Sequence, residues 1–299
     1  MAIIPTQSKY PDRAGYLGLD TDRNVLSVMS DGIMKSTSIP EGWVNVKDFG
    51  AKGDGIHDDT NAIQLALDTN KTVFIPKGTY IVSNLTWSHG NDIIGSGRTQ
   101  TVLKNITPNT SIININLPEG SSNFSTLANL GLTGLNSNNG LVFTNKCAGI
   151  ILNNLLFYKF YKAVYKQYGN INNKIINCQF SGTNYHWYAQ SISDMHCGLD
   201  SFIGCNFAWA EWAAIYYNND VYKTMGQIIF DNCIFEANPG FGIFIDNYGE
   251  DNYGESALSG ICLESTWFEK NGLSPTVTIN GIQYVPKDIY AKKIHHLFF

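Results

Sequence analysis

The chain has 299 residues, is 43% hydrophobic and 15% charged, and carries a formal net charge of −5, so it is long enough to bury a large core. Its Lys and Arg residues form no cluster and no apolar run approaches the roughly 20 residues of a membrane helix, which argues against nucleic-acid and membrane binding. The six cysteines lack CxxC spacing, so we expect buried thiols rather than a zinc site, and we expect no metal or cofactor.

The first 43 residues form a separate segment in the predicted organisation. The opening MAIIPTQSKYPDRAG lacks the order of charged, apolar and small residues that marks a signal peptide. The following GYLGLDTDRNVLSVMSDGIM alternates short apolar runs with Asp, Asn and Gly turns. We therefore predict a short N-terminal segment, residues 1–43, ahead of a larger domain over residues 44–299.

The stretch VNVKDFGAKGDGIHDDTNAIQLALD, residues 44–68, places two adjacent aspartates after a glycine-rich run. Asp58, Asp59 or Thr60 can cap the first amides of a helix over residues 58–68, whose N-terminus favours negative charge. The apolar stripe of that helix consists of Ala62, Ile63, Ala66 and Leu67. TVFIPKGTYIVSNLTW then predicts a strand, a Pro-Lys-Gly turn and a further strand. We assign the two aspartates to capping rather than to catalysis.

The second half of the chain repeats with a period in the twenties. Its markers are Leu132, Phe157, Phe180, Phe207, Phe235 and Phe268, at spacings of 25, 23, 27, 28 and 33 residues. Short β-rich runs broken by Gly and Asn at this period predict a parallel β-helix, since the regular Leu/Asn consensus of leucine-rich repeats is missing.

In stacked coils, equivalent positions lie above one another. We therefore expect Cys178, Cys205 and Cys233 in one inward column and the phenylalanines in another. The uneven spacing indicates insertions at residues 183–200 and 246–260. The predicted helix would cover the open apolar end of the first coil.

The run VKDFGAKGDGIHDDTNAIQLAL followed by TVFIPKGTY resembles the N-terminal signature of the pectate-lyase-like superfamily. That superfamily consists of right-handed parallel β-helices and includes polygalacturonases, pectate lyases and many bacteriophage tailspikes and depolymerases. The resemblance implies an all-β single solenoid with an N-terminal capping α-helix. It marks the cap rather than the reaction.

Residues 1–43 resemble the short particle-attachment segments that precede the β-helix in phage tailspikes. This resemblance implies a place in the virion tail, contact with a phage tail or baseplate protein through residues 1–43, and assembly as a homotrimer. The alternative is a leader without such a role.

Several pectinolytic chemistries are disfavoured by what the sequence lacks. The Asn-Thr-Asp, paired Asp, Gly-His-Gly and Arg-Ile-Lys motifs of polygalacturonases do not follow the cap, and no arginine follows Arg98, although many pectate lyases use an arginine base. A lyase with a Tyr, His or Lys base stays open, with Tyr185, His186, His196 and Lys223 as candidates.

A pair of glutamates gives the strongest catalytic signal. Aligning FDNCIFEAN with LESTWFEKN places Glu236 over Glu269, and if the phenylalanines point inward, both glutamates point outward one coil apart. Glycoside hydrolysis uses two such carboxylates, and their repulsion would raise one pKa. Trp267 would supply a sugar-stacking face. The alternative is a solvated glutamate in a structural turn; Asp231 and Glu264 make a weaker pair.

Aromatic residues concentrate around Glu211 in residues 184–222. They include Trp187, Trp209, Trp212, Tyr216, Tyr217 and Tyr222, of which all but Tyr222 are predicted to bind the sugar. Such rings grip pyranose faces, but exposed aromatics also form subunit interfaces, and both interpretations stay open.

These features predict a tailspike-type depolymerase that cleaves a bacterial surface polysaccharide, capsule or O-antigen, by hydrolysis. Glu236 and Glu269 are the predicted acid and its partner, with Glu211 as a further catalytic candidate. The alternatives are a non-catalytic receptor-binding adhesin and a polysaccharide lyase.

Overall fold

The computed structural model describes residues 17–20, 25–30, 33–36, 40, 42–118, 124–168, 171–190, 199–219, 226–247, 260–292 and 297–298. The chain divides into two compact units, Met1–Trp43 and Val44–Phe299. In the first unit, β1 (Leu17–Asp20), β2 (Val25–Ser30) and β3 (Ile33–Ser36) form an antiparallel sheet.

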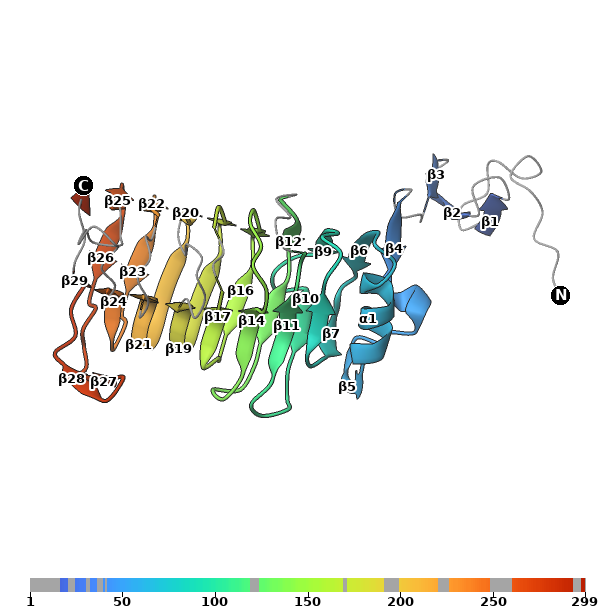
Figure 1. The fold of residues 1–299 in the computed structure, drawn as a ribbon. Helices are drawn as coiled ribbons and strands as arrows, with labels where there is room; N and C mark the ends of the chain where they lie inside the picture. The colour runs from blue at the N-terminus through green and yellow to red at the C-terminus, as the bar shows by residue number, and fades with distance from the viewer. Residues whose placement is uncertain are drawn as a thin grey trace. The chain divides into compact units, whose positions relative to one another are not determined.

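The second unit is a solenoid whose coils stack one after another, as the ribbon in Figure 1 shows from blue to red. The first strand of each coil belongs to a ten-stranded sheet. In chain order its strands are β4 (Trp43–Asn45), β6 (Thr72–Ile75), β9 (Ile93–Gly95), β12 (Thr126–Ala128), β15 (Ile151–Asn153), β18 (Lys174–Ile176), β20 (Ser201–Ile203), β22 (Ile228–Asp231), β25 (Ile261–Glu264) and β30 (Leu297–Phe298).

The remaining strands of the coils form a fifteen-stranded sheet, which is joined because β19 and β21 are long enough to occupy two positions each. One side holds β5 (Asp54–Asp58), β7 (Gly78–Ile81), β10 (Thr101–Lys104), β13 (Gly131–Thr133), β16 (Leu156–Tyr158), β19 (Gln179–Gln190), β21 (Asn206–Asn219), β23 (Ile234–Glu236) and β26 (Trp267–Glu269). The other side holds β8 (Leu85–Trp87), β11 (Ser111–Ile115), β14 (Asn139–Phe143), β17 (Lys162–Lys166), β24 (Phe241–Asn247) and β29 (Ile289–Lys292). Neighbouring coils pair in parallel, which confirms the predicted parallel β-helix.

The core consists of ladders of equivalent side chains. Phe157, Phe180, Phe207, Phe235 and Phe268 stack with ring centroids 4.6, 5.0, 4.7 and 4.8 Å apart, and Leu132 precedes them in register. The thiols of Cys178, Cys205 and Cys233 are buried, and each Sγ donates to a backbone carbonyl of the preceding coil at 3.3–3.5 Å. Both predicted inward columns are confirmed.

Asparagines occupy equivalent turn positions in several coils of the solenoid. Asn129, Asn154, Asn177 and Asn232 follow strands of the ten-stranded sheet with left-handed φ between 51 and 59°. Asparagine tolerates this conformation better than most residues because its short side chain bonds locally. The Nδ2 of Asn154 donates to Oδ1 of Asn129 at 2.8 Å, so the turns also bond to one another.

The cap consists of a 3₁₀ helix, η2 (Val46–Phe49), and the α-helix α1 (Thr60–Leu67). Ile63, Ala66 and Leu67 are buried, as the predicted stripe requires. The helix is shorter than the predicted 58–68, because Asp58 ends β5 and Asp59 is the N-cap residue. The Asp58 carboxylate accepts a hydrogen bond from the amide of Thr60 at 2.9 Å, so it caps the helix as expected.

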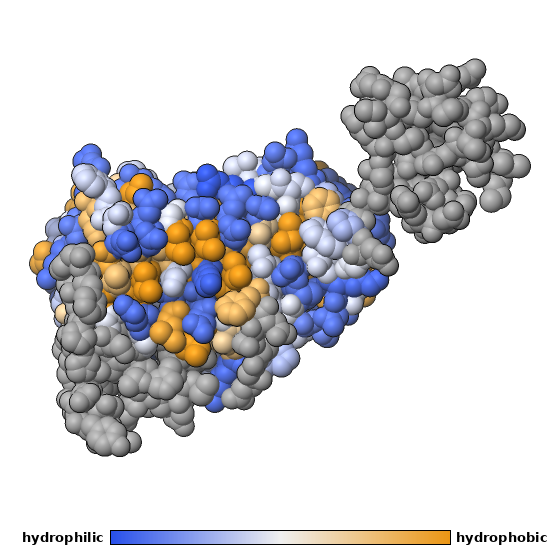
Figure 2. Space-filling model, turned by 90° about the horizontal axis from the view of Figure 1, so that it is seen from above, coloured by the Kyte–Doolittle hydropathy of each residue, from blue (hydrophilic) through white to orange (hydrophobic). Residues whose placement is uncertain are grey.

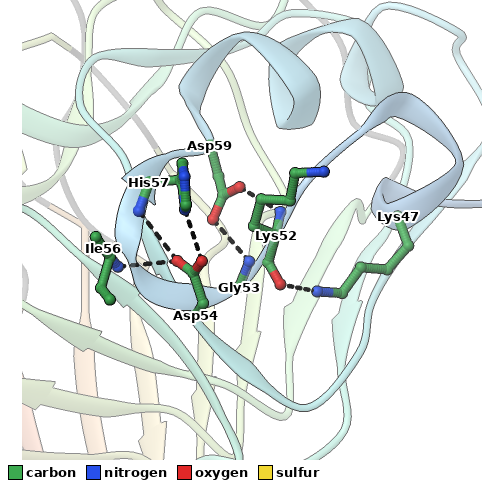
Figure 3. A network of polar contacts seen from close by, with 7 residues as sticks. All are labelled: Lys47, Lys52, Gly53, Asp54, Ile56, His57 and Asp59. Atoms are coloured by element: carbon green, nitrogen blue, oxygen red, sulfur yellow. Dashed lines mark hydrogen bonds and ion pairs between the residues drawn. The ribbon is translucent and has the colours of Figure 1, made fainter.

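The other aspartates of the cap hold the glycine-rich loop (Figure 3). Asp59 accepts hydrogen bonds from the amides of Lys52 and Gly53 at 2.5 and 2.9 Å and is 1% exposed. Asp54 accepts from the amides of Ile56 and His57, and these bonds lower the pKa of its carboxyl. The carboxylates of the opening motif therefore bind backbone, which agrees with a structural role.

Candidate functional site

The register of β21, β23 and β26 brings the two predicted glutamates into one column. Ala208 pairs with Glu236, and Glu236 pairs with Glu269. Because Phe235 and Phe268 stack inside, alternation turns both glutamates to the outer face of adjacent coils. Neighbouring strands lie about 4.8 Å apart, so the two side chains start from neighbouring points on this surface.

The two carboxylates have different environments. Glu236 is half-buried, and its Oε1 accepts a hydrogen bond from Nδ2 of Asn206 at 2.8 Å. Glu269 is exposed, and its Oε1 lies 3.1 Å from Nζ of Lys270. The hydrogen bond from Lys270 lowers the pKa of Glu269. The prediction that repulsion raises the pKa of one of the two glutamates therefore does not apply to Glu269, whose pKa Lys270 lowers.

Two exposed tryptophans flank this pair. Trp267 is 62% exposed and precedes Glu269 by two residues; Trp209 is 55% exposed and follows Ala208, the partner of Glu236. Trp209 has a left-handed φ of 61°, at a turn where the next coil has Ala237 at 51°. A bulky residue in this region costs on the order of 1–3 kcal/mol, and such strain clusters at functional sites.

Glu211 and Trp212 lie elsewhere, at an irregularity of the sheet. Thr183 pairs with Ala210 and Tyr185 with Ala213, so β21 has one residue more than β19 at this point. Glu211 is exposed here, outside the column of Glu236. Trp212 is half-buried, and its ring contacts that of Tyr185 edge to face at 5.2 Å.

Three predicted stacking residues are fully buried: Trp187, Tyr216 and Tyr217. Trp187 and Tyr217 point into the core, where the Tyr217 hydroxyl donates to Oδ2 of Asp200 at 2.7 Å. Tyr216 points outward, but the hairpin of β27 (Val277–Ile279) and β28 (Ile282–Tyr284) packs over it, and Asn280 donates to its hydroxyl at 2.9 Å. Their expected role as sugar-binding faces is wrong, because no ring face is left for a ligand.

The candidate lyase bases that the structure describes are buried. His186 is fully buried beside the stacked rings of Phe180 and Phe207, with ring centroids 5.7 and 6.0 Å away, and burial lowers its pKa to about 3. Tyr185 is 3% exposed, and burial raises its pKa. His196 and Lys223 lie outside the described residues. Lys162 is a further candidate base that the sequence did not predict. Its Nζ lies 3.8 and 3.7 Å from the ring centroids of Tyr165 and Tyr188, and desolvation lowers its pKa to about 8.

A polar groove of about 590 Å³ lies next to Glu236. Its lining residues are Arg98, Asn154, Asn177, Cys178, Gln179, Gly204 and Asn206. Asn206 belongs to both places, because it lines the groove and donates to Glu236. The sequence did not predict a role for Arg98 in the site, although it is the last arginine of the chain.

Within the part of the chain that the structure describes, no group of three or more His, Cys, Asp or Glu side chains is placed to hold a metal ion. The same residues include no helix long and apolar enough to cross a membrane.

A protein-family comparison matches residues 43–116 to the model "Rhamnogalacturonase A/epimerase, pectate lyase-like". Mannuronan C5-epimerase AlgE1 of Azotobacter vinelandii is 40% identical over 111 residues, 31% of this chain and 8% of that protein. The pre-neck appendage protein of Bacillus phage phi29 is 39% identical over 62 residues, 20% of this chain and 7% of that protein. These matches span less than a tenth of the relatives' lengths.

Solved structures share the fold at low sequence identity. Pre-mature bacteriophage phi29 gene product 12 aligns with a TM-score of 0.59 and 16% identity, covering 76% of this chain and 33% of that one. The phiAB6 tailspike, solved in complex with oligosaccharides of an Acinetobacter baumannii surface polysaccharide, aligns with a TM-score of 0.52 and 14% identity, covering 91% and 57%. The predicted resemblance to pectate-lyase-like parallel β-helices is confirmed, and phage tailspikes are among the solved structures that share this fold.

Proposed function

We propose that this chain is a tailspike-type protein of a phage tail that binds and hydrolyses a bacterial surface polysaccharide, capsule or O-antigen. The observation that carries the proposal is the outward carboxylate pair Glu236 and Glu269, with one exposed tryptophan on the strand of Glu269 and another on the coil before Glu236. Aromatic faces that stand in solvent suit pyranose rings, and a carboxylate pair is what glycoside hydrolysis requires. The tailspike neighbour with a bound surface oligosaccharide supports the same class of ligand.

The unequal environments assign the two roles. Lys270 keeps Glu269 ionised, which suits the nucleophile or general base. Glu236, half-buried and away from that cation, is the proton donor to the glycosidic oxygen, and the amide of Asn206 holds its other oxygen. Because neighbouring strands lie about 4.8 Å apart, the two side chains can bring their carboxyl groups to the roughly 5–5.5 Å that retaining enzymes use, and we propose the retaining reaction.

In the retaining sequence, Glu236 protonates the leaving oxygen as the glycosidic bond breaks and Glu269 bonds to the anomeric carbon. Water then displaces Glu269 and returns a proton to Glu236, which restores both groups. Trp209 and Trp267 would hold the sugars on either side of the scissile bond.

Assembly and location complete the proposal: a homotrimer, attached to a tail or baseplate protein through residues 1–43. The ten-stranded sheet supports lateral association, since Ile151, Ile176, Ile203 and Ile229 face outward from successive coils, with Ile203 37% exposed. Figure 2 shows hydrophobic residues gathered mid-length on the face seen from above. Light scattering should give three times the chain mass; a monomer at every concentration would remove this part.

The test treats capsule and O-antigen from candidate hosts with wild type, Glu236→Gln and Glu269→Gln. General acid–base assistance is worth about 100- to 10,000-fold, so each variant should lose nearly all activity while keeping its circular dichroism spectrum. Glu264→Gln is the matched control, because Glu264 is exposed on the ten-stranded sheet and pairs with Asp231.

The products distinguish the candidates. New reducing ends without unsaturated sugars indicate hydrolysis, whereas ultraviolet-absorbing unsaturated ends indicate a lyase. Glycan that binds but is never shortened supports the second candidate, a receptor-binding adhesin, which the exposure of both tryptophans also favours. Full cleavage by both variants would remove the glutamates from the site.

A further inference from the structure

The groove beside Asn206 has a charge opposite to that of the chain. The protein carries a formal net charge of −5, yet the groove is lined by one arginine, four amide side chains, a cysteine and a glycine, and by no carboxylate. Asn154, Asn177, Gln179 and Asn206 all bring amide groups to it. A surface concavity with a guanidinium and amide donors is suited to an anionic ligand.

Arg98 is held in place at the N-terminal end of this groove. Its loop is anchored by three backbone hydrogen bonds: the amide of Gly97 donates to the carbonyl of Asn129 at 2.8 Å, and the amides of Gln100 and Thr101 donate to that of Gly97. The Arg98 side chain is half-buried and lines the same groove as Asn154 and Asn177, residues of later coils.

The guanidinium has spare capacity for a ligand. Among the described residues Arg98 makes no ion pair, and its side chain has no hydrogen-bond partner in the part of the chain that the structure describes. Arginine carries five N–H donors in a planar fork, which matches a carboxylate or phosphate in two parallel bonds. A half-buried guanidinium left open in this way is suited to a partner that arrives from solution.

Asn206 connects the groove to Glu236. Gln179 pairs with Asn206 on the next coil, and Asn206 donates to Glu236 on the coil after that. Gln179 and Glu236 are thus two strand spacings, about 10 Å, apart along the solenoid axis. A glycan chain lying along the axis would pass from the groove to the carboxylate pair.

We propose that this groove is a subsite for an acidic sugar of the polysaccharide, with Arg98 pairing its anionic group while Asn177 and Gln179 bond its hydroxyls. This inference rests on the proposed function and narrows it to an acidic glycan. The anionic group is a carboxylate of a uronic-type sugar or a phosphate of a phosphodiester-linked repeat, since the guanidinium fits both.

The experiment measures binding of wild type and Arg98→Gln to acidic capsular polysaccharides of candidate hosts. Each polysaccharide is also prepared with its carboxyl groups reduced to alcohols and, separately, with its phosphodiesters cleaved. We expect wild type to bind the untreated glycan about 10- to 100-fold more tightly than the form that lacks the recognised anion, as a charge-assisted hydrogen bond would give. Whichever treatment abolishes the preference identifies the anion.

Arg98→Gln should bind the untreated glycan with the same 10- to 100-fold loss and should no longer distinguish the treated form. Lys104→Gln is the matched control, because Lys104 is an exposed cation on the same coil, outside the groove. It should bind like wild type. Should Arg98→Gln fail to fold, the comparison of glycan forms on wild type alone still decides.

Two outcomes overturn the inference. Equal binding of treated and untreated glycans, or unchanged binding by a folded Arg98→Gln, removes the acidic subsite but leaves the proposed function standing. Failure of wild type to bind any glycan of the panel counts against the proposed function as well.

Discussion

The buried ion pair of Lys166 and Asp200 offers a direct test of how the solenoid core tolerates charge. Both side chains are 0% exposed, and Nζ of Lys166 lies 2.7 Å from Oδ2 of Asp200. Lys166 takes an inward position, in register with Phe143 before it and Ala189 after it. Asp200 also accepts hydrogen bonds from Asn173 and Tyr217, each at 2.7 Å.

We expect Asp200→Asn to cost about 3–5 kcal/mol of unfolding free energy, because it removes the carboxylate charge that lies 2.7 Å from the buried lysine ammonium. Lys166→Met should cost nearer to about 3 kcal/mol, since Asn173 and Tyr217 still donate to the carboxylate. The double substitution removes both charges, and the new amide oxygen can still accept from those donors. We therefore expect it to be more stable than Asp200→Asn alone.

Urea unfolding followed by circular dichroism measures all four proteins as a double-mutant cycle. Lys71→Met is the control: Lys71 is exposed, so its replacement should stay within about 0.5 kcal/mol of wild type. A loss below about 1 kcal/mol of unfolding free energy for Asp200→Asn would contradict an ion pair that is shielded from water. Strict additivity of the two single substitutions would contradict an interaction between the two side chains.

Three further outcomes follow from the packing. Phe207→Ala, in the middle of the phenylalanine ladder with neighbours at 5.0 and 4.7 Å, should cost about 3–5 kcal/mol in urea unfolding, and a loss below about 1 kcal/mol would refute the ladder's role. Trp209→Gly should raise the melting temperature by relieving the φ of 61°, yet weaken glycan binding; unchanged binding would remove Trp209 from the site. Because burial lowers the folded-state pKa of His186 to about 3, against about 6.5 unfolded, the unfolded state binds more protons between these values. The free energy of unfolding should therefore fall as pH drops from 6.5 towards 3, by up to about 1.4 kcal/mol per pH unit from this residue. His186→Leu should reduce this pH dependence in urea titrations at several pH values. An unchanged pH dependence would show that His186 is not responsible.

The columns of the solenoid could be predicted because two simple periods act together. Strand alternation fixes which residues point inward, and coil stacking places equivalent residues next to one another. The Phe-Glu step at Phe235–Glu236 and Phe268–Glu269 uses both, so the inward rings and outward carboxylates followed from the sequence. The effect of Lys270 on the pKa of Glu269 could not be predicted from this pattern, because it depends on the direction that a flexible side chain takes.

The burial of the aromatic side chains after residue 184 could not be predicted in the same way, for two physical reasons. The extra residue of β21 between Ala210 and Ala213 shifts the alternation against β19, and one shifted position exchanges inner and outer faces. The burial of Tyr216 then depends on a hairpin that lies some sixty residues further along the chain and contacts it through Asn280. Sequence composition predicts that rings gather here, but it cannot predict which of them the fold covers.

The recognisable part of the sequence lies where the backbone leaves least choice, and that is away from the candidate site. Gly53 has a φ of 61°, and a Cβ there would lie 2.6 Å from the ring of Tyr80, while its amide must donate to Asp59. Few side chains satisfy such conditions, which explains why the family match falls on residues 43–116. Glu236 and Trp267, by contrast, point away from the core, where the coil accepts almost any residue. Similarity in the cap therefore identifies the solenoid, whereas the reaction has to be inferred from the outward columns and tested there.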